Sequence, residues 1–265
     1  MTYWHQPEIS PVLWHIWGPF QIRWYSLLYV GGFMVGRALL KKLSKDERFL
    51  FTSEDVDQLI VWLLVGCVIG ARLIYCLVYD PRGMMADPLY VFQIYKGGLS
   101  FHGGMLGVMA AAYLWARQKG IPFWNLGDAL ALATPTGLAM GRIGNFINGE
   151  LWGRVTTVPW GVIFKDGGPE PRHPSQLYEF LLEGVALFAL LWLLKNRLKR
   201  NGQISLVFLM GYSVSRFIGE MFREPDAQVG YLVAGLTMGQ ILSLIQVLAT
   251  ILLGIYLMRP EKKKA

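Results

Sequence analysis

Polar side chains interrupt the apolar sequence at residues 142–150, and their types suit the binding of an anion. Arg142, Asn145 and Asn148 are spaced i, i+3 and i+6, and Glu150 follows shortly after them. On a helix this spacing spreads the first three side chains over roughly 120° of one side. Because arginine binds phosphate through paired hydrogen bonds, such a group facing a cavity favours an anionic ligand.

A second polar group lies at residues 212–223. Tyr212, Arg216, Glu220 and Arg223 are spaced i, i+4, i+8 and i+11, so they fall within about 80° of one helix face. Arg216 and Glu220 could also satisfy each other as an i, i+4 ion pair. Buried ion pairs that tie helices together are therefore an alternative to an anion site.

The elements that position these groups are predicted to be transmembrane helices. Of 265 residues, 54% are hydrophobic and 16% are charged, with a mean hydropathy of +0.37, whereas soluble domains carry about 25% charged residues. Crossing a bilayer takes roughly 20 apolar residues. We predict an all-α integral membrane protein, a single polytopic domain over residues 1–265 with seven spans. The predicted spans are 22–40, 56–78, 99–116, 124–146, 176–194, 203–221 and 236–258.

The distribution of lysine and arginine predicts the orientation of these spans. Most of the basic residues fall in the connections at 41–48, 117–119 and 195–200 and in the C-terminal segment. Cytoplasmic loops carry such an excess, so the N-terminus is predicted outside and the C-terminus inside. Residues 150–174 then form a small outer, periplasmic cap. Because the net charge of +7 comes from these loop clusters, nucleic acid is not an expected partner.

With this orientation, ionisable residues of six spans lie in the outer half of the membrane. A charge at mid-membrane costs about 2.5–3.5 kcal/mol on insertion scales, so such residues need a partner or a function. Five arginines are predicted at this level and exceed what pairing requires: Arg23, Arg72, Arg142, Arg216 and Arg223. An anion site open to the outer leaflet would meet phospholipid head groups. Tyr25 and His102 fall at the same depth, and His102 is either a satisfied buried histidine or a proton acceptor.

Four segments resemble the bacterial prolipoprotein diacylglyceryl transferase family. The first is the run from Gly141 to Gly153, GRIGNFINGELWG, and the second is GGLSFHGG at 97–104. HPSQLYE at 173–179 and the stretch 212–223, followed by Glu-Pro-Asp226, complete the resemblance. These segments span most of the chain, so the resemblance is far more specific than a short glycine motif.

The resemblance implies an enzyme of the bacterial inner membrane whose site faces the periplasmic leaflet. Such an enzyme transfers diacylglyceryl from phosphatidylglycerol to the lipobox cysteine thiol in the signal peptide of a prolipoprotein, and releases glycerol phosphate. Arg142 and Arg216 carry over as head-group ligands. Further site residues carried over from the family are Tyr25, His102, Asn145, Glu150, Gly153 and Tyr212. The two helical groups add Asn148, Glu220 and Arg223 as substrate-binding candidates.

The expected chemistry needs no cysteine of this chain, no metal and no cofactor. A substrate thiolate attacks the glycerol carbon, and Arg142 and Arg216 stabilise the charge on the leaving phosphate. Cys67 and Cys76 lie on opposite helix faces and lack metal-ligand spacing. For the thiol proton, His102 is the first candidate and Glu150 the second. An anionic phospholipid transporter or flippase is the alternative function, although the inner halves of three predicted spans are apolar.

Overall fold

A computed structural model describes residues 3–17, 20–225 and 230–259 of the chain. The chain forms two compact units: Met1–Ala38 with Leu130–Ala265 is unit 1, and Leu39–Ala129 is unit 2. Asp226, the last residue of the fourth family-like segment, lies outside the described residues. Two long helices, α1 (Trp24–Leu43) and α5 (Phe123–Asn148), run from one unit into the other.

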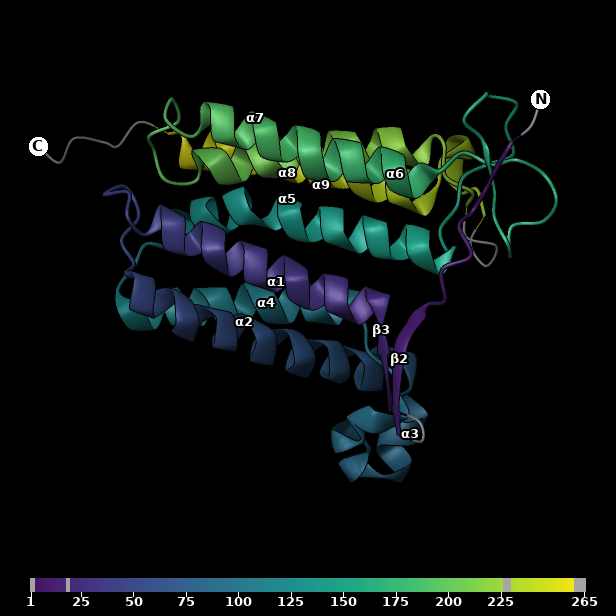
Figure 1. Ribbon diagram of the computed structural model, residues 1–265. Helices are drawn as coiled ribbons and strands as arrows, with labels where there is room; N and C mark the ends of the chain where they lie inside the picture. Colours follow the sequence, from purple (N-terminus) through teal and green to yellow (C-terminus); the bar gives the residue numbers. More distant parts are fainter. Residues whose placement is uncertain (1–2, 18–19, 226–229, 260–265) are drawn as a thin grey trace, which may run out of the picture. The chain divides into compact units, whose positions relative to one another are not determined.

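The helices of unit 1 follow the apolar stretches of the sequence. Residues 175–194 form one continuous helical run of three elements: α6 (Ser175–Glu179), the π-helix η4 (Phe180–Ala186) and α7 (Leu187–Leu194). This run lies beside α8 (Gln203–Glu220), which in turn packs against α9 (Met238–Leu257) (Figure 1). A short 3₁₀ turn, η5 (Val233–Gly235), precedes α9, which begins with a capping box between Thr237 and Gln240.

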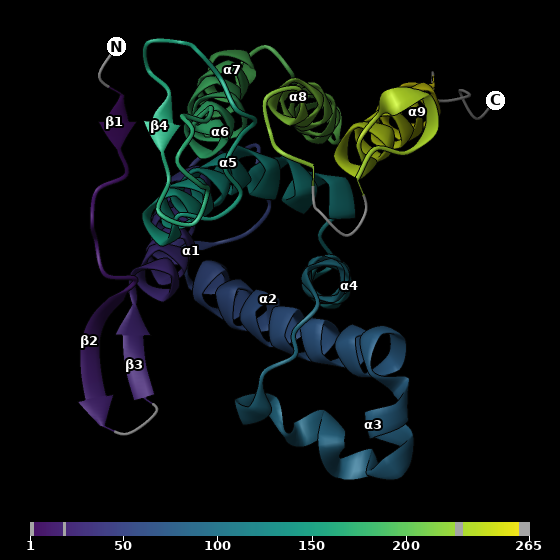
Figure 2. The same cartoon turned by 90° about the vertical axis from the view of Figure 1, so that its right-hand side faces the viewer.

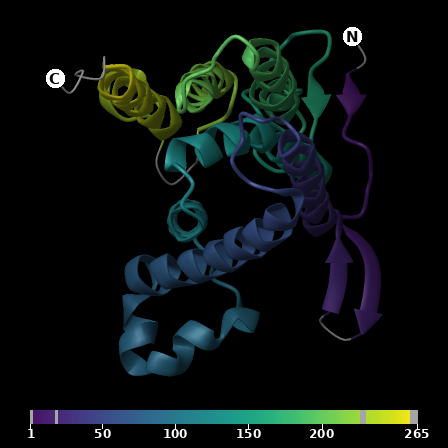
Figure 3. The same cartoon turned by 90° about the vertical axis from the view of Figure 1, so that its left-hand side faces the viewer.

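The N-terminal part of unit 1 is built from short strands. Strand β1 (Trp4–His5) pairs in parallel with β4 (Val162–Ile163) (Figure 2). Strands β2 (Val12–Trp17) and β3 (Phe20–Arg23) form an antiparallel hairpin (Figure 3). The predicted first span began at residue 22, which is wrong by two residues, because Ile22 and Arg23 belong to β3. Four of the six residues in 12–17 are β-branched or aromatic (Val12, Trp14, Ile16 and Trp17), which favours a strand.

The segment predicted as an outer cap, residues 150–174, contains no helix. Its only named strand is β4, and isolated bridges join Val155 and Val162 to Arg172. Strand β4 covers two residues, Val162 and Ile163. The many prolines and glycines of this segment account for its irregular backbone.

Unit 2 contains a close helix pair, α2 (Ser53–Ile74) and α4 (Phe101–Lys119) (Figure 2). A Cβ added to Gly66 would lie 2.6 Å from the carbonyl oxygen of Gly107, so only glycine permits this approach. Gly66 and Gly70 of α2 and Gly103 and Gly107 of α4 have the GxxxG spacing that favours such close helix packing. The connection holds η1 (Tyr75–Tyr79), α3 (Pro81–Ala86), η2 (Pro88–Phe92) and η3 (Ile94–Lys96).

Each of the seven stretches predicted to span the membrane is largely helical in the described chain. By length and composition, three helical runs are apolar enough to cross a bilayer: Ser53–Tyr79, Ser175–Leu194 and Met238–Leu257. The membrane character is therefore supported by these helices. The total of seven spans stays a prediction.

Candidate functional site

Arg142 of α5 faces the helical run 175–194 and is held there by two glutamates. Its Nε and Nη2 atoms donate to Oε2 of Glu183, at 3.2 and 2.9 Å. Its Nη1 atom lies 3.0 Å from Oε2 of Glu179. Both glutamate side chains are fully buried, and Arg142 keeps 14% of its side-chain area exposed. All three nitrogens of the guanidinium group therefore contact a glutamate oxygen.

Arg216 of α8 shares one of these glutamates. Its Nη1 atom donates to Oε1 of Glu179, and its Nη2 atom donates to Oε1 of Glu220 on its own helix. Oε1 of Glu183 is 3.9 Å from Nη1. Glu179 thus bridges Arg142 and Arg216, which brings the two arginines expected to bind a head group into one network. The i, i+4 pair of Arg216 with Glu220, left open by the sequence, is confirmed.

Glu220 also connects this network to α9 and to the end of α8. Thr237 Oγ1 donates to Glu220 Oε2 at 2.7 Å, and Arg223 Nη1 lies 3.7 Å from Glu220 Oε1. Tyr212, one turn before Arg216, stacks on Phe208 with ring centroids 6.1 Å apart.

The expected excess of arginine over its counter-ions is wrong for this site. Within the described part of unit 1, the three arginines of this network are matched by three acidic side chains. The matched residues are Arg142, Arg216 and Arg223 with Glu179, Glu183 and Glu220. Glu179 and Glu183 were not among the predicted site residues. The signal that could have found them is a pair of carboxylates four residues apart inside an apolar stretch.

Arg72 was counted among the head-group arginines, and the structure gives it a different role. Its side chain is 2% exposed and donates to five backbone carbonyls of unit 2, with distances of 2.5–3.3 Å. These acceptors are Tyr90, Val91, Gln93, Gly97 and Gly98. Arg72 therefore binds the connection that leads into α4.

His102 lies in the first turn of α4, in unit 2, and its side chain is exposed. Its ring meets that of Phe101 edge to face, with centroids 5.7 Å apart. The helix is capped by Ser100, whose side chain accepts from the backbone N–H of Gly103 at 3.2 Å. The assignment of His102 as a proton acceptor stays a prediction.

Glu150 and the two asparagines predicted with it form a second cluster, at the end of α5. Glu150 Oε1 accepts from Asn145 Nδ2 at 2.9 Å and from Asn148 Nδ2 at 3.1 Å. Gln176 donates to the Glu150 backbone carbonyl at 2.6 Å. Among the described residues, the buried Oδ1 of Asn148 and Oε1 of Gln176 accept no hydrogen bond.

Two glycines of the same segment permit close contacts. A Cβ at Gly153 would lie 2.5 Å from the carbonyl oxygens of both His173 and Phe222, so this position has no room for a side chain. Gly153 also bridges Arg223 in antiparallel fashion. A Cβ at Gly144 would lie 2.9 Å from the ring of Tyr25, so this glycine lets Tyr25 pack on α5.

His173 lies in the irregular segment before α6, and its Nδ1 is 3.0 Å from the hydroxyl of Tyr178. Burial, followed by the charge of Arg154, lowers the pKa of His173 below its ordinary value of 6.5. A neutral imidazole is thus favoured beside the site.

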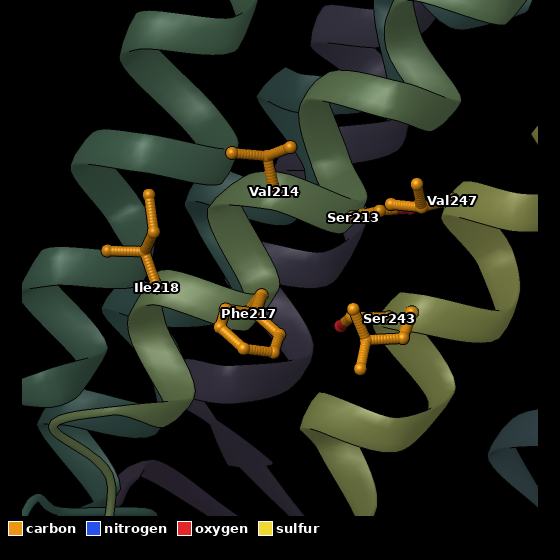
Figure 4. Close-up of a pocket in the computed structure, with 7 residues that line it drawn as sticks. Ser213, Val214, Phe217, Ile218, Ser243 and Val247 are labelled. Atoms are coloured by element: carbon orange, nitrogen blue, oxygen red, sulfur yellow. The ribbon is translucent and has the colours of Figure 1, made fainter.

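An apolar pocket lies between α8 and α9 (Figure 4). Its lining carries no charged side chain and consists of Ser213, Val214, Phe217, Ile218, Ser243, Leu244 and Val247. Arg216 belongs to the same stretch of α8 as four of these residues. The pocket suits a hydrocarbon chain rather than a head group.

The described residues contain no group of three or more histidine, cysteine, aspartate or glutamate side chains that could hold a metal ion. Cys67 and Cys76 are not joined by a disulfide.

Comparison with known proteins gives consistent matches over nearly the whole chain. A family model described as prolipoprotein diacylglyceryl transferase matches residues 11–256. The chain is 49% identical to the phosphatidylglycerol–prolipoprotein diacylglyceryl transferase of Idiomarina loihiensis, over 99% of this chain and 97% of that protein. It is 48% identical to the protein of the same name from Nitratidesulfovibrio vulgaris, over 97% of each chain. For the Pseudomonas aeruginosa protein the identity is 46%, over 96% of each.

Proposed function

The chain belongs to the prolipoprotein diacylglyceryl transferase family, and from this membership we propose its reaction and the part that each site residue takes in it. The protein is a bacterial membrane transferase. It transfers the diacylglyceryl group of phosphatidylglycerol to the lipobox cysteine thiol of a prolipoprotein, forms a thioether and releases glycerol phosphate. This reaction is the first step of lipoprotein maturation.

Arg142 and Arg216 bind the phosphate of phosphatidylglycerol. The observation that carries this assignment is that Glu179 holds both guanidinium groups in one buried network. When the substrate thiolate attacks the glycerol carbon, the carbon–oxygen bond to phosphate breaks and negative charge grows on the leaving group. Two fixed cations in a water-poor site stabilise that charge strongly.

The remaining site residues surround this centre. Asn145, Asn148 and Glu150 suit the glycerol hydroxyls of the head group, because their cluster presents both amide and carboxylate oxygens. Glu220 holds Arg216 within α8, and Arg223, just beyond the end of this helix, lies 3.7 Å from Oε1 of Glu220. Tyr25, Gly153 and Tyr212 complete the substrate-binding set, and Gly153 acts by leaving space for the backbone of 173 and 222.

His102 takes the thiol proton, with Glu150 as the second candidate. The exposed imidazole of His102 suits a proton acceptor near neutral pH. Glu150 already accepts two amide hydrogen bonds through Oε1, which fix the position of its carboxylate at the end of α5.

The two units act as one polytopic domain of the inner membrane. Seven helical stretches cross the bilayer, the N-terminus is outside, and the site opens towards the periplasmic leaflet beneath the cap of residues 150–174. The excess of lysine and arginine in alternate loops supports this orientation.

A transfer assay tests the proposed function. Purified protein is mixed with phosphatidylglycerol and a lipobox peptide, and the mass of the peptide product is measured by mass spectrometry. A gain of one diacylglyceryl group is expected, and lipid movement without product would indicate a flippase instead. Arg142→Ala should abolish transfer in protein that still inserts into the membrane, and robust activity of that variant would refute the head-group role.

A further inference from the structure

Glu183 lies at the centre of the site, and both of its hydrogen bonds come from one arginine, Arg142. It belongs to the π-helix η4, an irregularity often found at functional sites. Its side chain is fully buried. Both hydrogen bonds from Arg142 reach Oε2, while Oε1 accepts none and lies 3.9 Å from the nearest nitrogen of Arg216.

The other two glutamates of the network do not take the Nε edge of Arg142. Glu179 bridges the two arginines: its Oε1 accepts from Arg216, and its Oε2, which accepts no hydrogen bond, lies 3.0 Å from Nη1 of Arg142. Glu220 contacts Arg216, receives a hydrogen bond from Thr237 and lies close to Arg223. Of the three carboxylates, Glu183 is therefore the one that an anion binding to the Nε and Nη2 edge of Arg142 displaces.

An incoming phosphodiester meets a site whose guanidinium donors are already in use. Arg142 gives Nε and Nη2 to Glu183, which is the paired edge that binds phosphate best. A phosphate that takes this edge leaves Glu183 without a hydrogen-bonded cation, with Nη1 of Arg216 still 3.9 Å from its Oε1. A buried carboxylate that has lost its hydrogen-bonded cation is too costly to stay ionised and becomes neutral instead.

We propose, on the basis of the proposed function, that Glu183 is the counter-ion which the lipid phosphate displaces from Arg142, and that it binds one proton as the lipid binds. The proton comes from solution and adds to a carboxylate oxygen. It returns to solution when glycerol phosphate leaves and the ion pair with Arg142 re-forms, so the overall reaction is unchanged. The charged groups that face Glu183 are Arg142 from α5, Glu179 from α6 and Arg216 from α8, and the titratable phenol of Tyr212 from α8 faces it as well.

Proton uptake by the unaltered protein is the first test. Binding heats for phosphatidylglycerol in detergent micelles are measured without peptide, in two buffers of equal pH and different ionisation enthalpy. The difference gives the number of protons bound per lipid. A value near one is expected at a pH where the free site is ionised, and a value of zero across the range pH 6–9 would overturn the proposal.

A variant then assigns the proton to Glu183. In the unaltered protein, affinity for phosphatidylglycerol should fall by up to about tenfold per pH unit on the alkaline side, because binding consumes a proton. Glu183→Gln keeps the shape without the charge. It should bind the lipid more tightly at alkaline pH and lose both the slope and the proton uptake. An unchanged slope in this variant would show that another group takes the proton.

The matched control is Asp57→Asn. Asp57 forms an ion pair with Lys41, and 47% of the Asp57 side-chain area is exposed. This control variant should keep the pH slope of the affinity and the number of protons bound per lipid of the unaltered protein. The transfer assay on the same preparation separates the two hypotheses. Lipidated peptide without proton uptake contradicts the role of Glu183 alone, whereas absence of any lipidated peptide contradicts the proposed function.

Discussion

Asn145 donates a hydrogen bond of 2.9 Å from its side-chain amide to Oε1 of Glu150. The bond forms because the chain turns back at the end of α5, where Gly149 and Leu151 have φ angles of +68° and +60°. A leucine in the left-handed region is strained, and such strain concentrates at functional sites. The turn places the carboxylate of Glu150 over the last turns of the helix, where it accepts from Asn148 as well.

Replacing Asn145 by Asp should reduce transfer by about 100-fold or more, because a donor to Glu150 becomes a second carboxylate at a buried position. Initial rates of peptide lipidation measure the loss, and gel filtration in detergent checks the fold. Asn201→Asp, in the connection before α8, serves as the control. A variant at Asn145 that retains more than half of the normal rate would contradict a role for this hydrogen bond.

Gly153→Ala should inactivate the protein and lower its melting temperature. The added Cβ would lie 2.5 Å from two backbone oxygens, so the backbone segments at 153, 173 and 222 must separate. Gly31→Ala is the matched control, because a Cβ at Gly31 meets nothing within 4 Å. We expect the control to keep its activity and to gain slightly in helix stability. Equal melting temperatures for the two variants would exclude the steric explanation.

The sequence was sufficient to predict the helical stretches and to name most of the polar residues of the candidate site. Apolar runs of suitable length predict helices, and the spacing of Arg216 and Glu220 predicts their ion pair. The pairing of Arg142 could not be predicted from its own helix, because Glu179 and Glu183 come from another helical run. The only sequence signal for these two glutamates was their position inside an apolar stretch. The spacing of residues along one helix does not indicate which other helix packs against it.

Arg72 shows a second limit of the sequence. Its depth in the predicted span was consistent with an anion site, but its actual acceptors are five backbone carbonyls of residues 90–98. Carbonyl groups belong to every residue, so no residue type marks them as partners. The hairpin at 12–23 was not predicted from the sequence, because its strand pattern is short and adjoins an apolar stretch.

Arg72→Met should loosen the connection between α2 and α4. Five carbonyls lose a charged donor, and each buried acceptor left without a partner costs about 1–3 kcal/mol. Hydrogen exchange followed by mass spectrometry should show faster exchange in residues 90–100, while peptides from α8 stay protected. Arg72→Lys should restore part of the protection. Unchanged exchange in 90–100 would mean that other contacts hold this connection.

The stability of the protein should fall at acid pH in a way that depends on His173. Its folded-state pKa is lowered, first by burial and then by Arg154, so the unfolded chain binds the proton more tightly. The contribution of neutral His173 is fully present above its ordinary value of 6.5 and is lost as the pH falls through the folded-state pKa. His173→Gln should show a smaller drop in melting temperature between pH 7 and pH 5. If the drop is the same in both proteins, other groups control the acid sensitivity.

His102→Gln should slow peptide lipidation and leave the affinity for phosphatidylglycerol unchanged. Glutamine keeps the polarity of the exposed side chain but cannot accept the thiol proton near neutral pH, and general base catalysis contributes about 10²–10⁴-fold. Rates should recover towards alkaline pH, where the substrate thiol ionises without help. The measurement is the rate at saturating lipid from pH 6.5 to 9.5, compared with His5→Gln, which alters another exposed histidine. Near-normal turnover of His102→Gln at pH 7 would exclude this histidine as the base, and attention would pass to Glu150.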